Sequence, residues 1–290
     1  MKERLERLLG SRVDAIEFVQ GRGYTHAGRH RVALDDGRSV FVKSAVDGLS
    51  AGWLRLEQVV YSNVDAPFLP RWVAYDDVDG LPLLVLEDLS DTHWPPPWRE
   101  GDVAAVRAAL EAVAETRAPA GLTPMGDWRA EWLSAWEGVA DDPAPFLSSG
   151  LASRAWLARA LPELESAAAR APVEAGTSLL HLDVRSDNLA LTGRGALLVD
   201  WNWASEGNPL LDRVCWAPSL CIENAMRPEE VVDGDGVGEM AALVSGVWAQ
   251  AAGLPPPPTA APRVRALQLA QLRIALPWAC RLLGIPEPAT

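Results

Sequence analysis

Residues 181–212 read HLDVRSDNLALTGRGALLVDWNWASEGNPLLD, and this stretch decides how the chain is interpreted. An acid and an amide, Asp183 and Asn188, stand five residues apart after an apolar strand, and a turn at 193–195 divides two short apolar runs. Such a turn predicts a hairpin that returns the chain to its starting point. Asn188 and Asp200 are therefore expected to lie side by side.

The residue types in this stretch suit phosphoryl transfer. Carboxylate and amide oxygens bind Mg²⁺, so Asn188 and Asp200 could share a metal ion carried on nucleotide phosphates. Asp183 stands one loop away, where it would orient a substrate hydroxyl and accept its proton. The alternative for Asp183 and Asp200 is a pair of carboxylates that only cap loops, because Asp often caps turns and helices.

Three motifs in this order resemble the aminoglycoside phosphotransferase family of kinase-like enzymes. They are His-x-Asp-x-x-x-x-Asn at 181–188, an Asp-aromatic pair at 200–201 and Gly-x-Pro-x-x-Asp at 207–212. The resemblance implies an α+β, bilobal protein-kinase-like fold, with a small antiparallel-sheet N-lobe and a larger, mostly helical C-lobe. It also implies Mg²⁺ and ATP as cofactors, with GTP left open.

The resemblance gives roles to three further residues of the stretch. His181 is expected to pack against the catalytic loop and hydrogen-bond it, and Asp212 to bond the loop backbone from the start of a helix. Arg185 could touch the transferring phosphate or pair with a neighbouring acid, and both interpretations stay open.

The stretch departs from the family pattern at three places. The family often shows Gly, a Leu-His pair and Asp where this chain has Leu182, Val184-Arg185 and Asn208. The proposed base and metal ligands are unaffected, so the departures leave only the subfamily and the substrate open.

Lysine is rare in this chain: 24 of the 26 basic residues are arginine, and the lysines are Lys2 and Lys43. Lys43 follows the apolar run 40–42, where a compact ammonium group could reach phosphates. The resemblance implies that Lys43 contacts the α and β phosphates and that Glu57, from the following helix, holds it. The alternatives are an exposed strand lysine and an exposed helix glutamate.

Two further segments are interpreted through the same resemblance. Backbone groups of Glu87 to Leu89, at the end of a strand, would meet the adenine. Gly21-Arg22-Gly23 could begin the turn over the phosphates, although an ordinary hairpin turn explains it equally well.

The hydrophobic periodicity predicts a strand-rich first part and a helical second part. The expected domains are an N-terminal nucleotide-binding lobe at 1–88, a Pro-rich linker at 89–100, and a helical C-terminal lobe at 101–290 with the catalytic loop and substrate site. The first part is expected to contain a helix at 1–10, strands at 12–20, 24–34, 38–46, 72–76 and 83–87, and a helix at 50–64. The second is expected to contain strands at 178–181, 189–191 and 196–199 and helices at 102–118, 128–139, 150–170, 209–224, 237–252 and 262–284.

Composition narrows the function. The 290 residues are 49% apolar, and the net charge of −13 argues against binding nucleic acid, which needs clustered Lys and Arg. No secretory signal or run of transmembrane length is visible, so a cytoplasmic protein that does not interact with membranes is expected. The three cysteines lack paired CxxC spacing and are interpreted as reduced core thiols.

The leading functional hypothesis is an ATP-dependent O-phosphotransferase acting on a hydroxyl of a small molecule. Residues 91–290 carry 25 acidic and 15 basic side chains, which favours a cationic acceptor such as an aminoglycoside-like antibiotic, an amino sugar or an amino alcohol. The alternatives are a nucleotide-binding pseudokinase or interaction module and, less favoured, a protein kinase. The acceptor, the choice between ATP and GTP, and the oligomeric state stay open. Candidate residues for an acidic substrate pocket are Glu206, Glu223, Glu229, Glu230, Asp233 and Asp235.

Overall fold

The computed structural model describes residues 1–19, 27–258 and 263–288. Its contacts group the chain into two compact units, each assembled from separate stretches of sequence. The first unit comprises Met1–Ala112, Pro119–Leu122 and Ser186–Ala204, and the second comprises Val113–Ala118, Thr123–Arg185 and Ser205–Thr290. The expected domain boundaries around a linker at 89–100 stay a prediction, and Gly21-Arg22-Gly23 lies outside the described residues.

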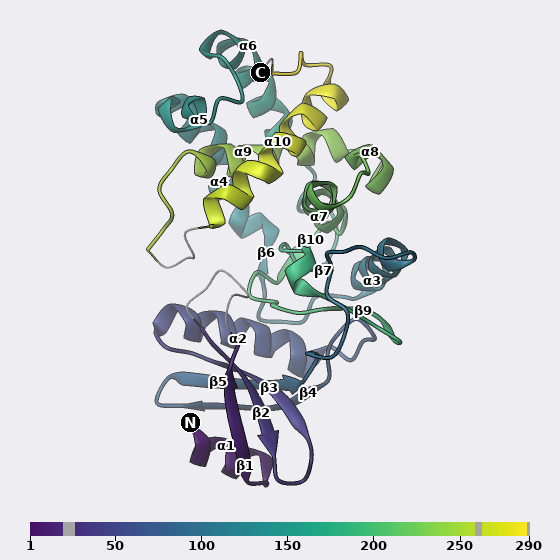
Figure 1. The fold of residues 1–290 in the computed structure, drawn as a ribbon. Coiled ribbons are helices and arrows are strands. Elements are labelled where there is room, and N and C mark those ends of the chain that lie inside the picture. Colours follow the sequence, from purple (N-terminus) through teal and green to yellow (C-terminus); the bar gives the residue numbers. More distant parts are fainter. Residues whose placement is uncertain (20–26, 259–262, 289–290) are drawn as a thin grey trace. The chain divides into compact units, whose positions relative to one another are not determined.

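A five-stranded antiparallel sheet forms the first unit, in the order β1-β2-β3-β5-β4 (Figure 1). A turn at Asp79-Gly80 joins β4 to β5, and both residues have positive φ, 55° and 72°, as a tight hairpin requires. Gly37, with φ 82°, provides the left-handed residue in the turn between β2 and β3. The strands are β1 Val13–Phe18, β2 Gly28–Leu34, β3 Ser39–Ser44, β4 Trp72–Val78 and β5 Leu81–Glu87.

Two helices accompany this sheet. Helix α1, Lys2–Leu9, contributes Leu5 to a core made by apolar side chains of the strands, and α2, Gly48–Asn63, contacts β3, β4 and β5. Asp47 caps the start of α2, where its carboxylate accepts from the Ser50 N–H at 2.8 Å. The N-terminal part of the first unit therefore has the predicted order of elements.

A second, smaller piece of the first unit comes from residues 186–204. The 3₁₀ turn η1 Ser186–Asn188 leads into the hairpin of β8 Leu189–Thr192 and β9 Gly195–Leu198. The hairpin is tied to earlier sequence, because the Leu198 N–H donates to the Phe68 carbonyl at 2.8 Å. The hairpin packs against this earlier sequence because its strands are almost wholly apolar and are buried there.

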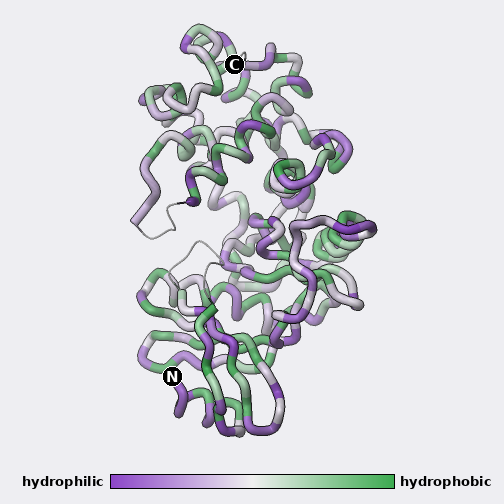
Figure 2. The backbone as a smooth tube through the Cα atoms, in the orientation of Figure 1, coloured by the Kyte–Doolittle hydropathy of each residue, from purple (hydrophilic) through white to green (hydrophobic). Residues whose placement is uncertain are grey.

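Helices dominate the second unit (Figure 1). Along them polar and apolar residues alternate in short groups (Figure 2), the pattern of helices that bury one side. Helix α9 approaches α4 closely, because a Cβ at Gly246 would come within 2.7 Å of the Trp136 ring. The helices are α4 Met125–Asp141, α5 Ala144–Ser148, α6 Arg154–Ala169, α7 Leu210–Glu223, α8 Pro228–Val231, α9 Val237–Ala252 and α10 Val264–Leu283, and α3 Asp102–Glu115 begins in the first unit and ends in the second.

A three-stranded sheet in the second unit was not expected in full. The predicted strand β7, Ser178–Leu180, pairs with β10, Ser205–Gly207, which also pairs with β6, Thr123–Pro124. With two or three residues each, β6 and β10 are too short to show an alternating pattern, and their partners lie far away in sequence.

The thiols and the helix lengths bear on two further expectations. The three cysteines are free; Cys215 and Cys280 are buried as predicted, whereas Cys221 is only half-buried. Within the described part of the chain, none of the helices combines the length and apolar character that crossing a membrane requires.

Candidate functional site

Lys43 is positioned by the alternation of strand β3. Val40 and Val42 face the core of the sheet, so Phe41 and Lys43 face the other side and line a cavity. Lys43 is only 4% exposed, and its ammonium group donates to the carboxylates of Glu57 and, at 2.5 Å, Asp200. Burial alone would lower the pKa of Lys43, but these two carboxylates outweigh it and raise the pKa.

Glu57 reaches Lys43 from the buried face of α2. Its side chain is fully buried, and burial raises its pKa to about 7, although the Lys43 charge acts in the opposite direction. One carboxylate oxygen, Oε2, has no hydrogen-bond partner among the described residues. A buried carboxylate with one unsatisfied oxygen costs free energy, which is typical of residues retained for function rather than for stability.

Asp200 lies two residues after the end of β9 and has a left-handed backbone, with φ 68°. Its Oδ1 accepts from Lys43, and its Oδ2 lies 3.9 Å from the Arg29 guanidinium. The hairpin register brings Asn188 opposite the residue before Asp200, since the Val199 N–H donates to the Asn188 carbonyl at 3.0 Å. Asp200 thus lies beside two side-chain cations.

The donor set at Asn188 and Asp200 fits a magnesium ion held jointly with phosphates. Amide and carboxylate oxygens are the hard ligands that Mg²⁺ takes, and it usually completes its shell with phosphate oxygens and water. No group of three or more His, Cys, Asp or Glu side chains in the described ranges could hold a metal by itself. The ion would therefore need the nucleotide as a co-ligand.

Arg29 belongs to this cluster and was not predicted. It lies on β2 directly opposite Lys43, is 7% exposed, and lines the same cavity. The signal was present in the sequence, because the Asp36-Gly37 turn fixes which residues of the two strands face each other. The predicted strands at 24–34 and 38–46 carried no register.

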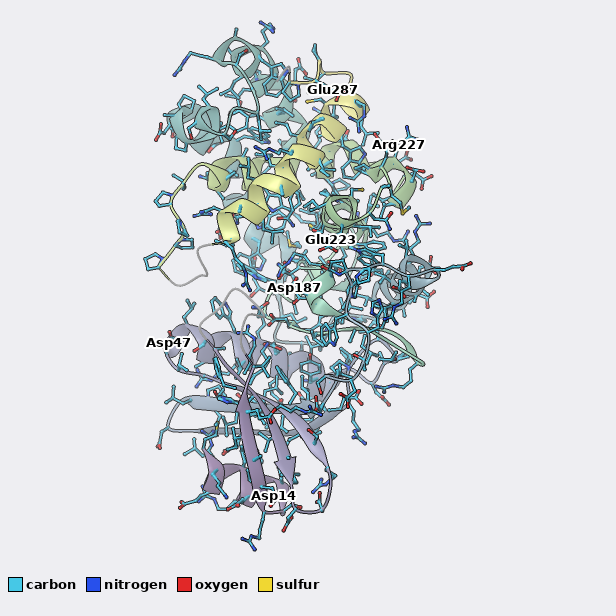
Figure 3. The ribbon with its side chains drawn as sticks, viewed as in Figure 1. Asp14, Asp47, Asp187, Glu223, Arg227 and Glu287 are labelled. Carbon is cyan, nitrogen blue, oxygen red and sulfur yellow. The ribbon has the colours of Figure 1, made fainter. Side chains whose placement is uncertain are left out.

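A cavity of about 300 Å³ in the first unit collects these residues. Its walls combine the charged Arg29, Lys43 and Asp200 with apolar side chains from several strands and loops. Such a combination of apolar walls and a few convergent polar groups is typical of small-molecule sites. The apolar lining includes Val19, Phe41, Leu86, Leu89, Trp94 and Val199, and Asp187 (labelled in Figure 3) also lines it.

Glu87, Asp88 and Leu89, at the end of β5, line the same cavity. The Glu87 side chain accepts from the Arg71 N–H at 2.8 Å and from the Arg194 guanidinium, so its carboxylate is held at the surface of the unit. The structure thus brings Lys43, Glu57, Asn188 and Asp200 together with the strand end, all within the first unit.

The second unit holds the other predicted residues, His181, Asp183, Arg185 and Asp212. The Asp212 carboxylate, at the start of α7, accepts from the His181 N–H at 2.8 Å and the Leu182 N–H at 2.7 Å. His181 is fully buried, and its Nδ1 accepts from the Asp183 N–H at 3.2 Å. Burial raises the pKa of Asp212.

Leu182 and Arg185 complete this loop. Leu182 has φ 62°, the left-handed conformation that favours Gly, and this explains why its position is often Gly in the family. The Arg185 guanidinium pairs with the Asp183 carboxylate, the second of the two interpretations that the sequence left open.

Several other candidates have ordinary structural surroundings. Trp201, the aromatic residue of the Asp-aromatic pair, is fully buried and donates to the Leu198 carbonyl at 2.9 Å, so it packs in the core. Among the acidic candidates, Glu229 pairs with Arg281 and Glu230 with Arg227.

Comparison with solved structures shows the same fold in kinase-like phosphotransferases. A thermostable mutant of aminoglycoside phosphotransferase APH(4)-Ia, with ADP and hygromycin B, gives a TM-score of 0.58 at 15% identity and covers 98% of this chain and 97% of its own. Spectinomycin phosphotransferase, APH(9)-Ia, with ADP and spectinomycin, gives 0.59 at 11% identity, covering 94% and 92%. An aminoglycoside phosphotransferase from Alicyclobacillus acidocaldarius gives 0.57 at 16% identity, covering 96% and 94%. These similarities confirm the predicted fold class.

Sequence comparison supplies the family. The search of curated proteins finds no match. A family model described as the phosphotransferase enzyme family matches residues 31–233, more than two thirds of the chain. The predicted resemblance is therefore confirmed, and the chain belongs to the phosphotransferase enzyme family.

Proposed function

We propose that this protein transfers the γ-phosphoryl group of ATP to a hydroxyl of a small molecule, giving ADP and a phosphate monoester. The observation that carries the proposal is the cluster that the buried Lys43 and Glu57 form with Asp200 at the wall of a cavity. A lysine held between two carboxylates keeps its charge despite burial, as a phosphate-binding cation must. A nucleotide-binding protein without turnover is the alternative.

Each residue of the cluster has a proposed task. Lys43 binds the α and β phosphates, Glu57 holds its ammonium group in place, and Asn188 and Asp200 hold Mg²⁺. When bound, that ion would neutralise charge on the phosphate oxygens. Arg29 adds a second buried cation next to Asp200, so the phosphates would meet two positive charges in this cavity.

The chemical step is assigned to the loop that precedes Asn188. Asp183 orients the acceptor hydroxyl and takes its proton as the new oxygen–phosphorus bond forms and the bond to ADP breaks. Its ion-pair partner Arg185 holds the carboxylate in position. Backbone bonds from His181 and Leu182 to Asp212 keep the loop in shape.

The acceptor class is proposed from charge. The excess of acidic side chains in residues 91–290 favours a cationic molecule, and solved relatives of this fold are complexes with hygromycin B and spectinomycin. An aminoglycoside-like antibiotic, an amino sugar or an amino alcohol is therefore the proposed acceptor.

Thermal melting with and without Mg²⁺-ATP tests the nucleotide site, followed by a phosphate-transfer screen over these acceptors. We expect a magnesium-dependent rise in melting temperature and transfer to at least one acceptor. Asp183→Ala should abolish turnover and leave nucleotide affinity within about threefold, because its carboxylate acts on the acceptor. Equal turnover by Asp183→Ala and the wild type would remove Asp183 as the base, and no melting shift at millimolar nucleotide would remove the kinase assignment.

A further inference from the structure

The segment after β5 carries a backbone carbonyl that accepts three hydrogen bonds. The Leu89 oxygen accepts from the Thr92 N–H at 3.1 Å, the Thr92 hydroxyl at 2.7 Å and the Trp94 indole N–H at 3.0 Å. A carbonyl oxygen has two lone pairs, so these donors fill its capacity. No further donor can bind there without displacing one of them.

The Leu89 N–H is in the opposite situation. Leu89 is buried and lines the cavity, and its N–H donates to no acceptor among the described residues. A buried amide without an acceptor is unfavourable, so a ligand atom that accepts a hydrogen bond there would be stabilised. The backbone of Leu89 can therefore donate a hydrogen bond to a ligand through its N–H, but its carbonyl oxygen cannot accept one.

The neighbouring acidic side chains are already engaged in hydrogen bonds with other residues. The Asp88 carboxylate accepts from the Arg31 guanidinium at 2.6 Å, the Ser39 hydroxyl at 2.5 Å and the Ser90 N–H at 2.9 Å. Although burial alone would raise the pKa of Asp88, these hydrogen bonds lower it. Both hydrogen bonds to Glu87, from the Arg71 N–H and the Arg194 guanidinium, go to its Oε1.

The turn that fills the Leu89 carbonyl is itself held in place. Between its two donor residues, His93 exchanges backbone hydrogen bonds with Leu191 of β8, at 3.2 and 2.7 Å. Trp94 packs with Leu89, Ala190 and Leu197 in one apolar cluster. Thr92 and Trp94 are therefore fixed from both sides, and their donors are not readily turned away.

Adenine and guanine differ in the hydrogen-bond donors and acceptors that they would present to the backbone of Leu89. The edge of adenine presents the acceptor N1 beside one donor, the N6 amino group, whereas guanine presents two donors, N1–H and the N2 amino group, beside the acceptor O6. We propose that Thr92 and Trp94 make this site select adenine over guanine nucleotides, by occupying the carbonyl that the guanine donors need. This inference rests on the proposed nucleotide site and decides between ATP and GTP.

Calorimetric titration of the 290-residue protein with Mg²⁺-ADP and Mg²⁺-GDP measures the selection directly, without turnover. The wild type should bind ADP at least about tenfold more tightly than GDP, because unpaired buried donors on guanine are costly. Thr92→Val removes the hydroxyl donor and keeps the shape of the side chain, and Trp94→Phe removes the indole donor and keeps an aromatic ring. The double variant should narrow the ratio of affinities at least about fivefold, chiefly through tighter GDP binding.

The matched control is Trp72→Phe, because Trp72 donates its indole N–H to Gln58 and does not line the cavity. Its ratio of affinities should equal that of the wild type. Equal binding of ADP and GDP by the wild type would overturn the inference whether or not the variants fold. An unchanged ratio in a double variant with normal circular dichroism would overturn it as well. Failure of both nucleotides to bind the wild type would remove the proposed function together with this inference.

Discussion

Two aspartates, Asp200 and Asp212, are held in different ways, and each anchors its own unit. Asp200 is held by side-chain cations, with Lys43 at 2.5 Å and Arg29 at 3.9 Å. Asp212 is held by main-chain N–H groups of two consecutive residues, at 2.8 and 2.7 Å. Side chains can turn toward an incoming ligand, whereas main-chain amides cannot leave without refolding the loop. The difference indicates that Asp200 is built to exchange partners and Asp212 to keep them.

Electrostatics supports the same distinction. The partners of Asp200 are charged, so binding a metal ion there would release Lys43 and Arg29 to other anions, such as phosphates. Burial raises the pKa of Asp212, while the two amide hydrogen bonds stabilise its charged form. A carboxylate in that position stabilises the loop in every state of the protein.

Asp200→Asn should have the largest effect, and it should fall on function. The substitution keeps the shape but removes the charge that would bind Mg²⁺, so turnover should fall about 10³-fold or more and Mg²⁺-ADP affinity at least about tenfold. Lys43 keeps its bond to Glu57, so the melting temperature should stay close to that of the wild type. Calorimetry with and without Mg²⁺, together with thermal melting, checks both parts.

Asp14→Asn is the control for Asp200→Asn, because Asp14 lies exposed on β1 and the change in net charge is the same. It should leave both affinity and turnover at the wild-type level. The contrast between the two aspartates would be lost if Asp200→Asn strongly lowered the melting temperature, or if its nucleotide binding kept the magnesium dependence of the wild type.

Asp212→Ala should be the next largest effect, and it should fall on stability. Two N–H groups would lose their acceptor, at about 1–3 kcal/mol each, so the free energy of unfolding should drop by about 2–6 kcal/mol. Asp212→Asn keeps one acceptor oxygen, so its free energy of unfolding should drop less than that of Asp212→Ala. Denaturant unfolding of the three proteins measures the order. A wild-type midpoint for Asp212→Ala would show that the loop is held by other contacts.

Local patterns made part of this arrangement predictable from sequence. The Asp36-Gly37 and Asp79-Gly80 turns fix hairpins because their residues suit left-handed backbone, and alternation along β3 indicates which side Lys43 faces. The catalytic-loop motif has fixed spacing, and its hairpin needs only nearby residues. These features depend on a few neighbours, so a single sequence contains them.

Other parts depend on partners that are distant in sequence. The pairing of β10 with β6 joins Ser205 to Thr123, and neither strand is long enough to show a period. The three donors on the Leu89 carbonyl form a turn with no motif, and only coordinates reveal that its acceptor is filled. Arg29 is an intermediate case. Its partner Lys43 is close in sequence, and counting the strand register from the Asp36-Gly37 turn places the two residues opposite each other.

Glu57→Gln tests the cluster around Asp200 through the dependence of its stability on pH. Burial raises the pKa of Glu57 from 4.5 to about 7, so between these values the folded protein binds a proton that the unfolded chain has lost. This contribution to stability is complete below about pH 4.5 and decreases as the pH rises toward 7. A glutamine side chain cannot titrate, so the stability of Glu57→Gln relative to the wild type should increase from about pH 5 to about pH 8.

Nucleotide binding should change in the opposite direction in the same variant. A neutral amide in place of the carboxylate would hold the Lys43 ammonium group less firmly, so Mg²⁺-ADP affinity should fall severalfold at about pH 8. Thermal melting and calorimetry at the two pH values measure both effects. A difference in stability that stays constant over this pH range would argue against a raised pKa at Glu57, and an unchanged affinity against its role in holding Lys43.

Leu182→Gly should have the smallest effect, and it tests what holds the loop near Asp212. Leu182 is left-handed, with φ 62°, which costs about 1 kcal/mol for a residue with a Cβ. Gly removes that strain but gives the unfolded chain more freedom, worth about 0.5–1 kcal/mol. The two terms oppose each other, so the free energy of unfolding should change by less than about 1 kcal/mol. Leu182→Val keeps the strain and adds a β-branch, so it should be less stable than Leu182→Gly. Denaturant midpoints give the order, and a loss above about 2 kcal/mol for Leu182→Gly would mean that the Leu182 side chain, rather than the bond from its N–H to Asp212, fixes the loop.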